Sequence, residues 1–230
     1  MIKNLKTKPV DHSLTYKKLT FRNFVHISRL NAIKKSINKF PVENIKSFAD
    51  LGCSNGYITN ILSKIMPSSK AFGFDRSENI AKANDNYSHI TFNKLDLNTK
   101  NINHENFDLV TCFETLEHVG DIHNALENIN QLSRKFTFIS VPIEHGIIGI
   151  IKYLIKRIFY RYKLELKCSD YTYFKALIFG RDISIYREQK NGHGSHFGFD
   201  YRVIDEFLQK NDVDYSAYNK LTTRYYFIEK

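Results

Sequence analysis

Three aspartates each end an apolar segment in the first half of the chain. Asp50 ends the run IKSFAD, Asp75 ends AFGFD and Asp96 ends ITFNKLD. A carboxylate attracts an ammonium group by charge, and it accepts hydrogen bonds from the two hydroxyls of a ribose diol. These spacings therefore indicate a binding site for a ligand that carries cationic and hydroxyl groups.

Small residues follow the first aspartate in the segment DLGCSNG, residues 50–56. Gly52 and Gly56 let the backbone approach a ligand closely, because glycine has no Cβ. A dinucleotide site needs the pattern GxGxxG, and here no third glycine stands at that offset. Asp50 would also repel a pyrophosphate. The ligand indicated is a cationic adenosine derivative without phosphates, and S-adenosylmethionine fits, with Asp50 near its ammonium, Asp75 at the ribose and Asp96 at the adenine.

Strands and helices are predicted to alternate through about residue 142. Apolar runs predict five strands, at residues 45–51, 71–75, 90–96, 107–113 and 136–142. Periodic patterns between them predict helices at residues 57–65, 77–84 and 120–132, with Ser77 as the N-cap of the second helix. This alternation indicates an α/β fold, with a parallel sheet covered by helices on both faces. Residues 201–211 predict a later helix, and 213–221 and 223–230 predict an antiparallel pair of closing strands.

Four segments in order resemble the motifs of the class I S-adenosylmethionine-dependent methyltransferases. They are DLGCSNG, with Ser54 in place of the middle glycine; GFDRSENIAKAN; KLDLN; and FDLVTCFETLEHV. The resemblance covers residues 45–145 strongly and 193–230 weakly. It implies a Rossmann-like seven-stranded sheet with helices on both faces, an N-terminal helical extension and a helical insertion after the fifth strand. The cofactor-binding residues that it implies are Asp50, Gly52, Ser54, Gly56, Asp75, Arg76, Asp96, Leu97 and Phe113.

The string ETLEHV in the fourth motif resembles the ubiquinone-pathway O-methyltransferases and glycan-modifying relatives. It also resembles the small-RNA 3′-terminal methyltransferases, in which an ExxEH set and a later histidine hold a divalent metal over a ribose diol. Carried over, that set is Glu114, Glu117 and His118, completed by His193 or His196 of NGHGSHFGFD. Alternatively, Glu117 and His118 form a hydrogen-bonded pair that supports the pocket.

A hydroxyl acceptor must lose its proton during methyl transfer, to a general base or to a metal-bound group. Three residues near the predicted strand ends could do this: His118, Glu117 and His145, the last in VPIEHG after the fifth strand. The expected reaction is O-methylation of a glycan, glycolipid or secondary-metabolite hydroxyl. The alternatives are methylation of a polyprenyl quinone precursor at the membrane, metal-dependent ribose methylation of RNA, and a binding domain without catalysis.

Basic charge is concentrated at the N-terminus of the chain. The net charge is +10, and residues 1–46 contain eleven Lys or Arg against Asp11 and Glu43. Such a surface favours an anionic partner, or it is simply a solvated basic face. Residues 21–39 predict a basic amphipathic helix, and so we divide the chain into a basic helical extension, 1–44, and a methyltransferase domain, 45–230.

Residues 146–192 are the predicted helical insertion, and 146–163 within it combine an apolar stripe with basic residues. This helix is expected to be a lid that recognises the acceptor, a peripheral membrane contact, or a packing element. The three scattered cysteines, Cys53, Cys112 and Cys168, predict neither disulfides nor a zinc site. With no apolar leader and no apolar stretch of 18 residues, a cytoplasmic location is expected, with membrane association left open.

Overall fold

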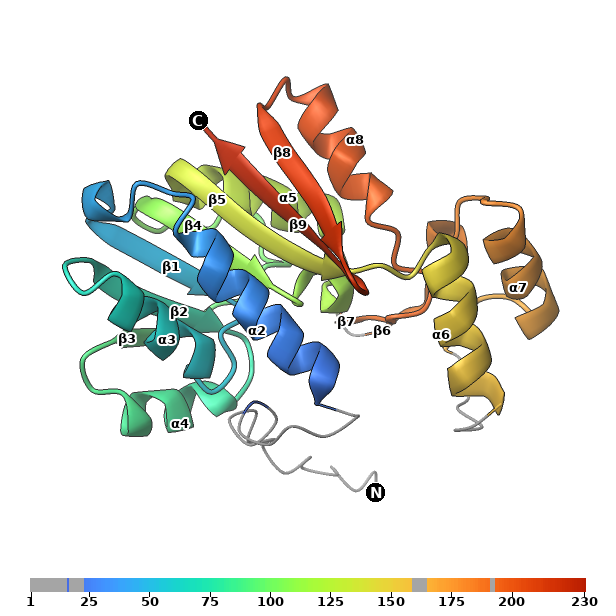
Figure 1. Ribbon diagram of the computed structural model, residues 1–230, viewed down its shortest axis with the longest axis horizontal. Helices are drawn as coiled ribbons and strands as arrows, with labels where there is room; N and C mark the ends of the chain where they lie inside the picture. Colours follow the sequence, from blue (N-terminus) through green and yellow to red (C-terminus); the bar gives the residue numbers. More distant parts are fainter. Residues whose placement is uncertain (1–15, 17–22, 159–164, 191–192) are drawn as a thin grey trace. The chain divides into compact units, whose positions relative to one another are not determined.

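A computed structural model describes residues 16, 23–158, 165–190 and 193–230 of the chain (Figure 1). The chain divides into two compact units, Met1–Leu95 and Asp96–Lys230.

Unit 1 is built on three parallel strands joined by two crossover helices (Figure 1). Its elements are α2 (Phe24–Ile37), η1 (Val42–Asn44), β1 (Ser47–Leu51), α3 (Tyr57–Ile65), β2 (Lys70–Asp75), α4 (Asn79–Asn86) and β3 (Thr91–Lys94). β2 pairs in parallel with both β1 and β3, and α3 and α4 pack against β2 and β3. Four consecutive residues of β1 are buried, as expected for a strand covered on both faces.

Unit 2 continues from a parallel pair of strands into an antiparallel hairpin. Its first elements are β4 (Phe107–Phe113), η2 (Leu116–His118), α5 (Ile122–Leu132), β5 (Ser133–Pro142), α6 (Gly146–Ile158) and α7 (Asp170–Ile178). Its remaining elements are η3 (Ser184–Tyr186), β6 (Gln189–Lys190), β7 (His193–Gly194), α8 (Arg202–Lys210), β8 (Tyr215–Lys220) and β9 (Thr223–Glu229). β4 and β5 are parallel, whereas β9 runs antiparallel to both β5 and β8.

The strand order β3-β2-β1-β4-β5-β9-β8 confirms the predicted Rossmann-like seven-stranded sheet. The two closing strands pair as an antiparallel hairpin, as the sequence predicts. β6 and β7 form a separate two-stranded sheet. The carboxyl ends of β1 and β2 in unit 1, and of β4 and β5 in unit 2, lead into the segments that carry the candidate residues.

Some element boundaries differ from those expected. The predicted helix 21–39 is seen as α2, and residues 1–15 and 17–22 of the predicted extension lie outside the described residues. The predicted helix 146–163 is α6 as far as Ile158, and residues 159–164 are likewise not described. Ser77 was wrongly predicted as an N-cap: α4 begins at Asn79, and the Ser77 amide instead donates to the Asp75 carboxylate.

A helix that the sequence analysis missed, α7, lies in the stretch interpreted as irregular. Ser169 caps its N-terminus by accepting a hydrogen bond from the Thr172 amide at 3.2 Å. Asp170 lies in its first turn and Lys175 in its last, which favours the helix dipole at both ends. These signals were present in the sequence. In the part of the chain that the structure describes, no helix has the length and apolar character needed to cross a bilayer.

Candidate functional site

The glycine turn of unit 1 bends three times into the left-handed backbone region. Gly52, Ser54 and Gly56 have φ angles of 78°, 50° and 75°. For a residue with a Cβ this conformation costs about 1–2 kcal/mol. Ser54 therefore adopts a left-handed backbone conformation that favours glycine. Gly56 begins α3, so the turn leads directly from β1 into the amino end of that helix.

The Asp75 carboxylate at the end of β2 holds this turn in place. It accepts hydrogen bonds at 2.7 Å from the amides of Ser54 and Ser77, one on each oxygen. The Asn79 side-chain amide donates to the Ser54 hydroxyl at 3.2 Å, which fixes the strained residue from a second side. Two oxygens offer about four lone-pair positions, so these two bonds leave acceptor capacity on Asp75. The predicted ribose-binding acid thus also orders the turn.

Asp50 at the end of β1 is almost fully buried and accepts a hydrogen bond at 2.7 Å from the Thr59 hydroxyl. The bond joins the end of the strand to the first turn of α3. Nothing in the sequence pattern singled out Thr59.

The ring of Phe92 packs against the glycine positions of unit 1. A Cβ on Gly56 would lie 2.6 Å from its ring, and a Cβ on Gly73 would collide with it. Both glycines therefore make room for this ring behind the turn. Arg76, the residue after Asp75, is half-buried.

In unit 2, the predicted adenine-side residues Asp96 and Leu97 belong to a hydrogen-bonded loop. Asp96 Oδ1 accepts from the main-chain and side-chain amides of Asn98 at 2.9 and 2.7 Å. The main-chain oxygen of buried Leu97 accepts from Asn124 and Asn128 of α5, each at 3.0 Å. Asn124 and Asn128 were not singled out in the sequence, because an amide on a distant helix carries no motif.

The end of β4 carries Phe113 and Glu114. Phe113 is buried and packs edge-on against Phe138, with ring centroids 5.0 Å apart. Glu114 has a φ of 49°, and its amide donates to the Ser140 main-chain oxygen at 2.9 Å. Its carboxylate accepts a 3.3 Å hydrogen bond from the Ser140 hydroxyl. Glu114 is therefore bonded to β5.

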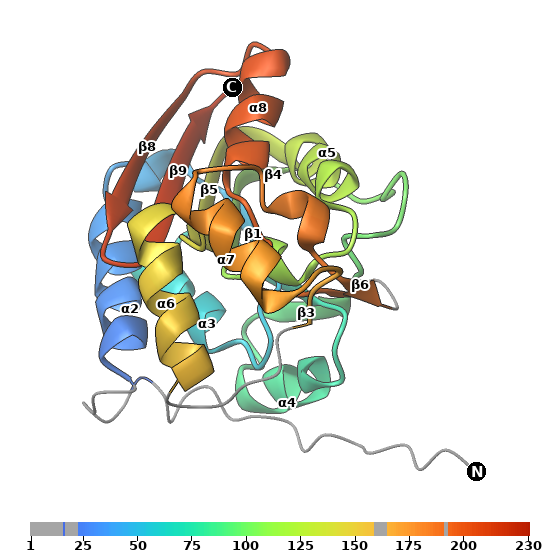
Figure 2. The same ribbon diagram turned by 90° about the vertical axis from the view of Figure 1, so that its right-hand side faces the viewer.

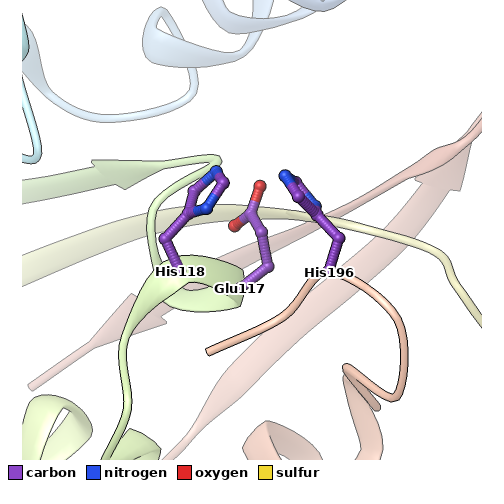
Figure 3. A group of neighbouring side chains, drawn as sticks. All are labelled: Glu117, His118 and His196. Atoms are coloured by element: carbon purple, nitrogen blue, oxygen red, sulfur yellow. The ribbon is translucent and has the colours of Figure 1, made fainter. Parts of the chain in front are cut away.

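Glu117, His118 and His196 come together in unit 2 (Figure 3). One ligand atom from each side chain lies within 4.8 Å of the other two. The two imidazole rings are 4.2 Å apart between centroids and meet at 82°, and Figure 3 shows them on either side of the carboxylate. Glu117 is buried, with 1% of its surface exposed, whereas His118 is an exposed residue. One carboxylate and two imidazoles can act as an acid–base group or as ligands of a divalent metal.

The structure decides between the two later histidines that the sequence offered. His196 lies in the cluster, and neither His193 nor Glu114 belongs to a metal-ligand group among the described residues. His193 is exposed in β7, where its backbone forms a bridge with Val119. His145, the third catalytic candidate, has its imidazole Nε2 3.2 Å from the main-chain oxygen of Arg181. That contact links the loop before α6 to the segment after α7.

A buried arginine, Arg187, forms hydrogen bonds to the main chain next to the cluster. It was not singled out in the sequence. Arg187 is 3% exposed, and its Nη2 donates to the main-chain oxygens of Glu117 and Val119 at 2.7 and 3.0 Å. Its Nε donates to the Ser195 oxygen at 2.9 Å. One guanidinium therefore joins the backbone that carries Glu117 and His118 to the backbone beside His196. Burial lowers the pKa of Arg187, and the Glu117 carboxylate acts in the opposite direction.

Glycines make room for this guanidinium. A Cβ on Gly194 would collide with the guanidinium, and a Cβ on Gly198 would lie 2.8–2.9 Å from the backbone and Cβ of Arg187. Gly198 also has a φ of 81°, which favours glycine for a second reason.

Comparison with known proteins matches residues 43–145 to the family described as "Methyltransferase domain". Putative methyltransferase 235L of Invertebrate iridescent virus 6 is 23% identical over 128 residues, which cover 54% of this chain and 48% of that protein. The malonyl-[acyl-carrier protein] O-methyltransferase of Bacillus cereus is 29% identical over 85 residues, covering 36% of this chain and 31% of that protein. The chain thus spans about half or less of the length of these curated relatives.

Among solved structures, the magnesium protoporphyrin IX methyltransferase of Synechocystis PCC 6803, crystallised with bound SAH, superposes with a TM-score of 0.60. It is 13% identical, and the match covers 95% of this chain and 92% of that one. At this identity the likeness concerns the fold. Residues 43–145 of this chain are thus similar to a methyltransferase domain, and the chain has the Rossmann-like fold of the Synechocystis structure.

Proposed function

We propose that this protein is an S-adenosylmethionine-dependent methyltransferase that methylates a hydroxyl oxygen of a glycan, glycolipid or secondary-metabolite acceptor. The observation that carries the proposal is the cluster of Glu117 and His118, in η2 just after β4, with His196, in the segment after β7. A hydroxyl is a poor nucleophile until its proton is removed, and this cluster supplies groups that can remove it. The similarity to a relative named malonyl-[acyl-carrier protein] O-methyltransferase supports methyl transfer to an oxygen atom, but a malonyl group offers a carboxylate, so that reaction gives an ester and not an ether.

The residues of the glycine turn fit the proposed cofactor. Asp75 is held by two amides and keeps acceptor capacity for the two ribose hydroxyls. Gly52 has no side chain, so a ligand can approach the backbone of the turn closely at that position. When bound, S-adenosylmethionine supplies a methyl group already activated on a sulfonium. The work left to the chain is to align the acceptor and accept its proton.

We assign the proton-accepting role to His118 and a positioning role to Glu117. His118 is the exposed member of the cluster, so its imidazole can reach an acceptor hydroxyl. Glu117 is buried beside the two rings, and a carboxylate there can orient an imidazole and stabilise its protonated form. As the hydroxyl oxygen gains the methyl group, its proton passes to the imidazole. His145 contacts Arg181, and we therefore give it a structural role.

The test uses the tritium-labelled methyl donor with lipid-linked and free oligosaccharides as acceptors. A methyl ether on a hydroxyl resists mild alkali, whereas a methyl ester releases methanol. We expect alkali-stable label, lost in His118→Ala and retained in His193→Ala, because His193 lies outside the cluster. Alkali-labile label, or equal activity in both variants, would contradict the proposal.

Metal-dependent methylation of a ribose hydroxyl of RNA is a second candidate, favoured by the same three ligand atoms within 4.8 Å. Two imidazoles and one carboxylate are a ligand set used for divalent metals, and a bound metal would lower the pKa of the acceptor hydroxyl. Titration with Mn²⁺ or Mg²⁺ alone, followed by calorimetry, tests this candidate without any activity assay. Binding that His196→Ala removes and His193→Ala retains would favour it, and absence of binding would eliminate it.

A further inference from the structure

The aliphatic side chains of α6 face outward. Ile147, Ile151, Leu154, Ile155 and Ile158 lie three or four positions apart, and so they share one face of the helix. Their exposed fractions run from 37% to 77%. We call these five residues the outer stripe. A helix on a globular protein normally turns such a stripe toward the core, so the orientation of α6 is inverted.

Contacts on the opposite face of α6 fix this orientation. Lys152 Nζ donates to a Glu144 carboxylate oxygen and to the Ile143 main-chain oxygen, both at 2.9 Å. Lys156 Nζ lies 4.4 Å from the centre of the Phe197 ring. The lysines of this helix therefore turn toward the protein, while its isoleucines turn away from it.

Gly149 and Tyr153, which also lie on the face of α6 opposite the outer stripe, contact the protein as well. A Cβ on Gly149 would collide with the Glu144 carbonyl, so glycine is what lets α6 approach that backbone. Tyr153 is buried and stacks on Phe174 of α7 at 5.2 Å between ring centroids. Figure 2 shows α6 and α7 side by side. Rotating α6 to bury the outer stripe would break all of these contacts.

The segment that carries the outer stripe is strongly basic. Residues 146–190 contain ten Lys or Arg and four Asp or Glu. An apolar face within a basic segment is typical of helices that lie in the interface of an anionic bilayer. The 13 residues of α6 span about 20 Å, which is too short to cross the hydrocarbon layer but long enough to lie along its surface.

We propose that the outer stripe of α6 docks this protein onto an anionic lipid surface. The aliphatic side chains enter the boundary between headgroups and acyl chains. The exposed cations of the following segment, Lys167, Lys175 and Arg181, meet the lipid phosphates. The inference goes beyond the reaction proposed above and does not depend on the acceptor. Its test needs neither cofactor nor catalysis, so the two proposals can fail separately.

The experiment is co-sedimentation of the full chain with vesicles of phosphatidylcholine alone or with one third phosphatidylglycerol. We expect binding to the anionic vesicles, and weakening by roughly tenfold or more in the double variant Ile151→Ser, Ile155→Ser, because two apolar side chains leave the lipid. The matched control, Ile151→Leu with Ile155→Leu, keeps an apolar face and should bind like the parent. Both sites are exposed, so the thermal unfolding midpoint of each variant should match the parent's.

Three results would overturn the proposal. The first is parent protein that stays in the supernatant with anionic vesicles, and the second is a serine variant that binds as tightly as the parent. The third is a concentration-dependent dimer in sedimentation velocity that the serine variant abolishes, which would assign the outer stripe to a second copy of the chain.

Discussion

Arg187 Nη2 donates a 2.7 Å hydrogen bond to the main-chain oxygen of Glu117, a residue 70 positions earlier in the chain. Because the same guanidinium also bonds Ser195, it sets the distance between the η2 segment and the loop that carries His196. A planar group with five donors in a fixed geometry suits this task, and a lysine ammonium does not. Arg187 touches the backbone behind the cluster, and so it is a positioning residue.

Arg187→Lys should therefore fold but lower kcat, by up to about 100-fold, because displacements near 1 Å are costly in an aligned reaction. KM for the methyl donor should change little, since the residue does not belong to the glycine turn. Steady-state kinetics on each substrate measures this split. Lys190→Met, at an exposed position three residues away, is the control and should behave like the parent. An unchanged kcat in a folded Arg187→Lys variant would refute the positioning role.

Gly194→Ala should destabilise the protein by about 1–3 kcal/mol, because the new Cβ collides with the Arg187 guanidinium. Urea unfolding of the parent and the variant measures the difference in free energy. In an Arg187→Met background the collision disappears, and the cost of Gly194→Ala should shrink. If Gly194→Ala lowers the free energy of unfolding equally in both backgrounds, the collision between the new Cβ and the Arg187 guanidinium is not the cause.

Asp75→Ala should weaken S-adenosylmethionine binding by roughly tenfold to a hundredfold, because two amides lose a charged acceptor and the turn loosens. Isothermal calorimetry gives the affinity directly. Glu78→Gln is the matched control, since Glu78 is exposed and pairs with Lys94 instead of the turn. Retention of full affinity by Asp75→Ala would place the cofactor elsewhere.

Lys156→Met should alter how stability depends on pH. Burial lowers the pKa of Lys156 below its ordinary value of 10.5, although the Glu144 carboxylate acts to raise it. Between the folded and unfolded pKa values the unfolded chain binds more protons, so the parent gains stability as the pH rises through that window. The methionine variant lacks this gain.

Urea unfolding of the parent and of Lys156→Met, at neutral and at alkaline pH, measures how the free energy of unfolding of each protein depends on pH. The stability of the variant relative to the parent should fall as the pH approaches 10.5. A difference that is constant with pH would mean that the lysine is not desolvated on folding.

Local chemistry made much of the fold and of the glycine turn predictable from the sequence. Apolar runs ending in Asp50 and Asp75 predicted strands β1 and β2, and the glycines between them predicted the turn. These features depend on residues within one strand–turn–helix unit, where backbone preference and burial pattern act directly. Even Ser54, the departure from the family motif, keeps the left-handed backbone expected of glycine.

The sequence by itself determined the alternation of strands and helices, the acids at the strand ends, and the presence of an apolar stripe and lysines in α6. Only the tertiary structure decided that His196 joins Glu117 and His118, that Arg187 holds them, and that the outer stripe faces away from the core. Periodicity shows that a helix has two faces, but contacts with distant residues such as Phe197 determine which face turns inward. Likewise, the backbone of His193 bridges Val119 beside η2, but only the His196 side chain joins the cluster, and a contact between segments about 70 residues apart has no local signature.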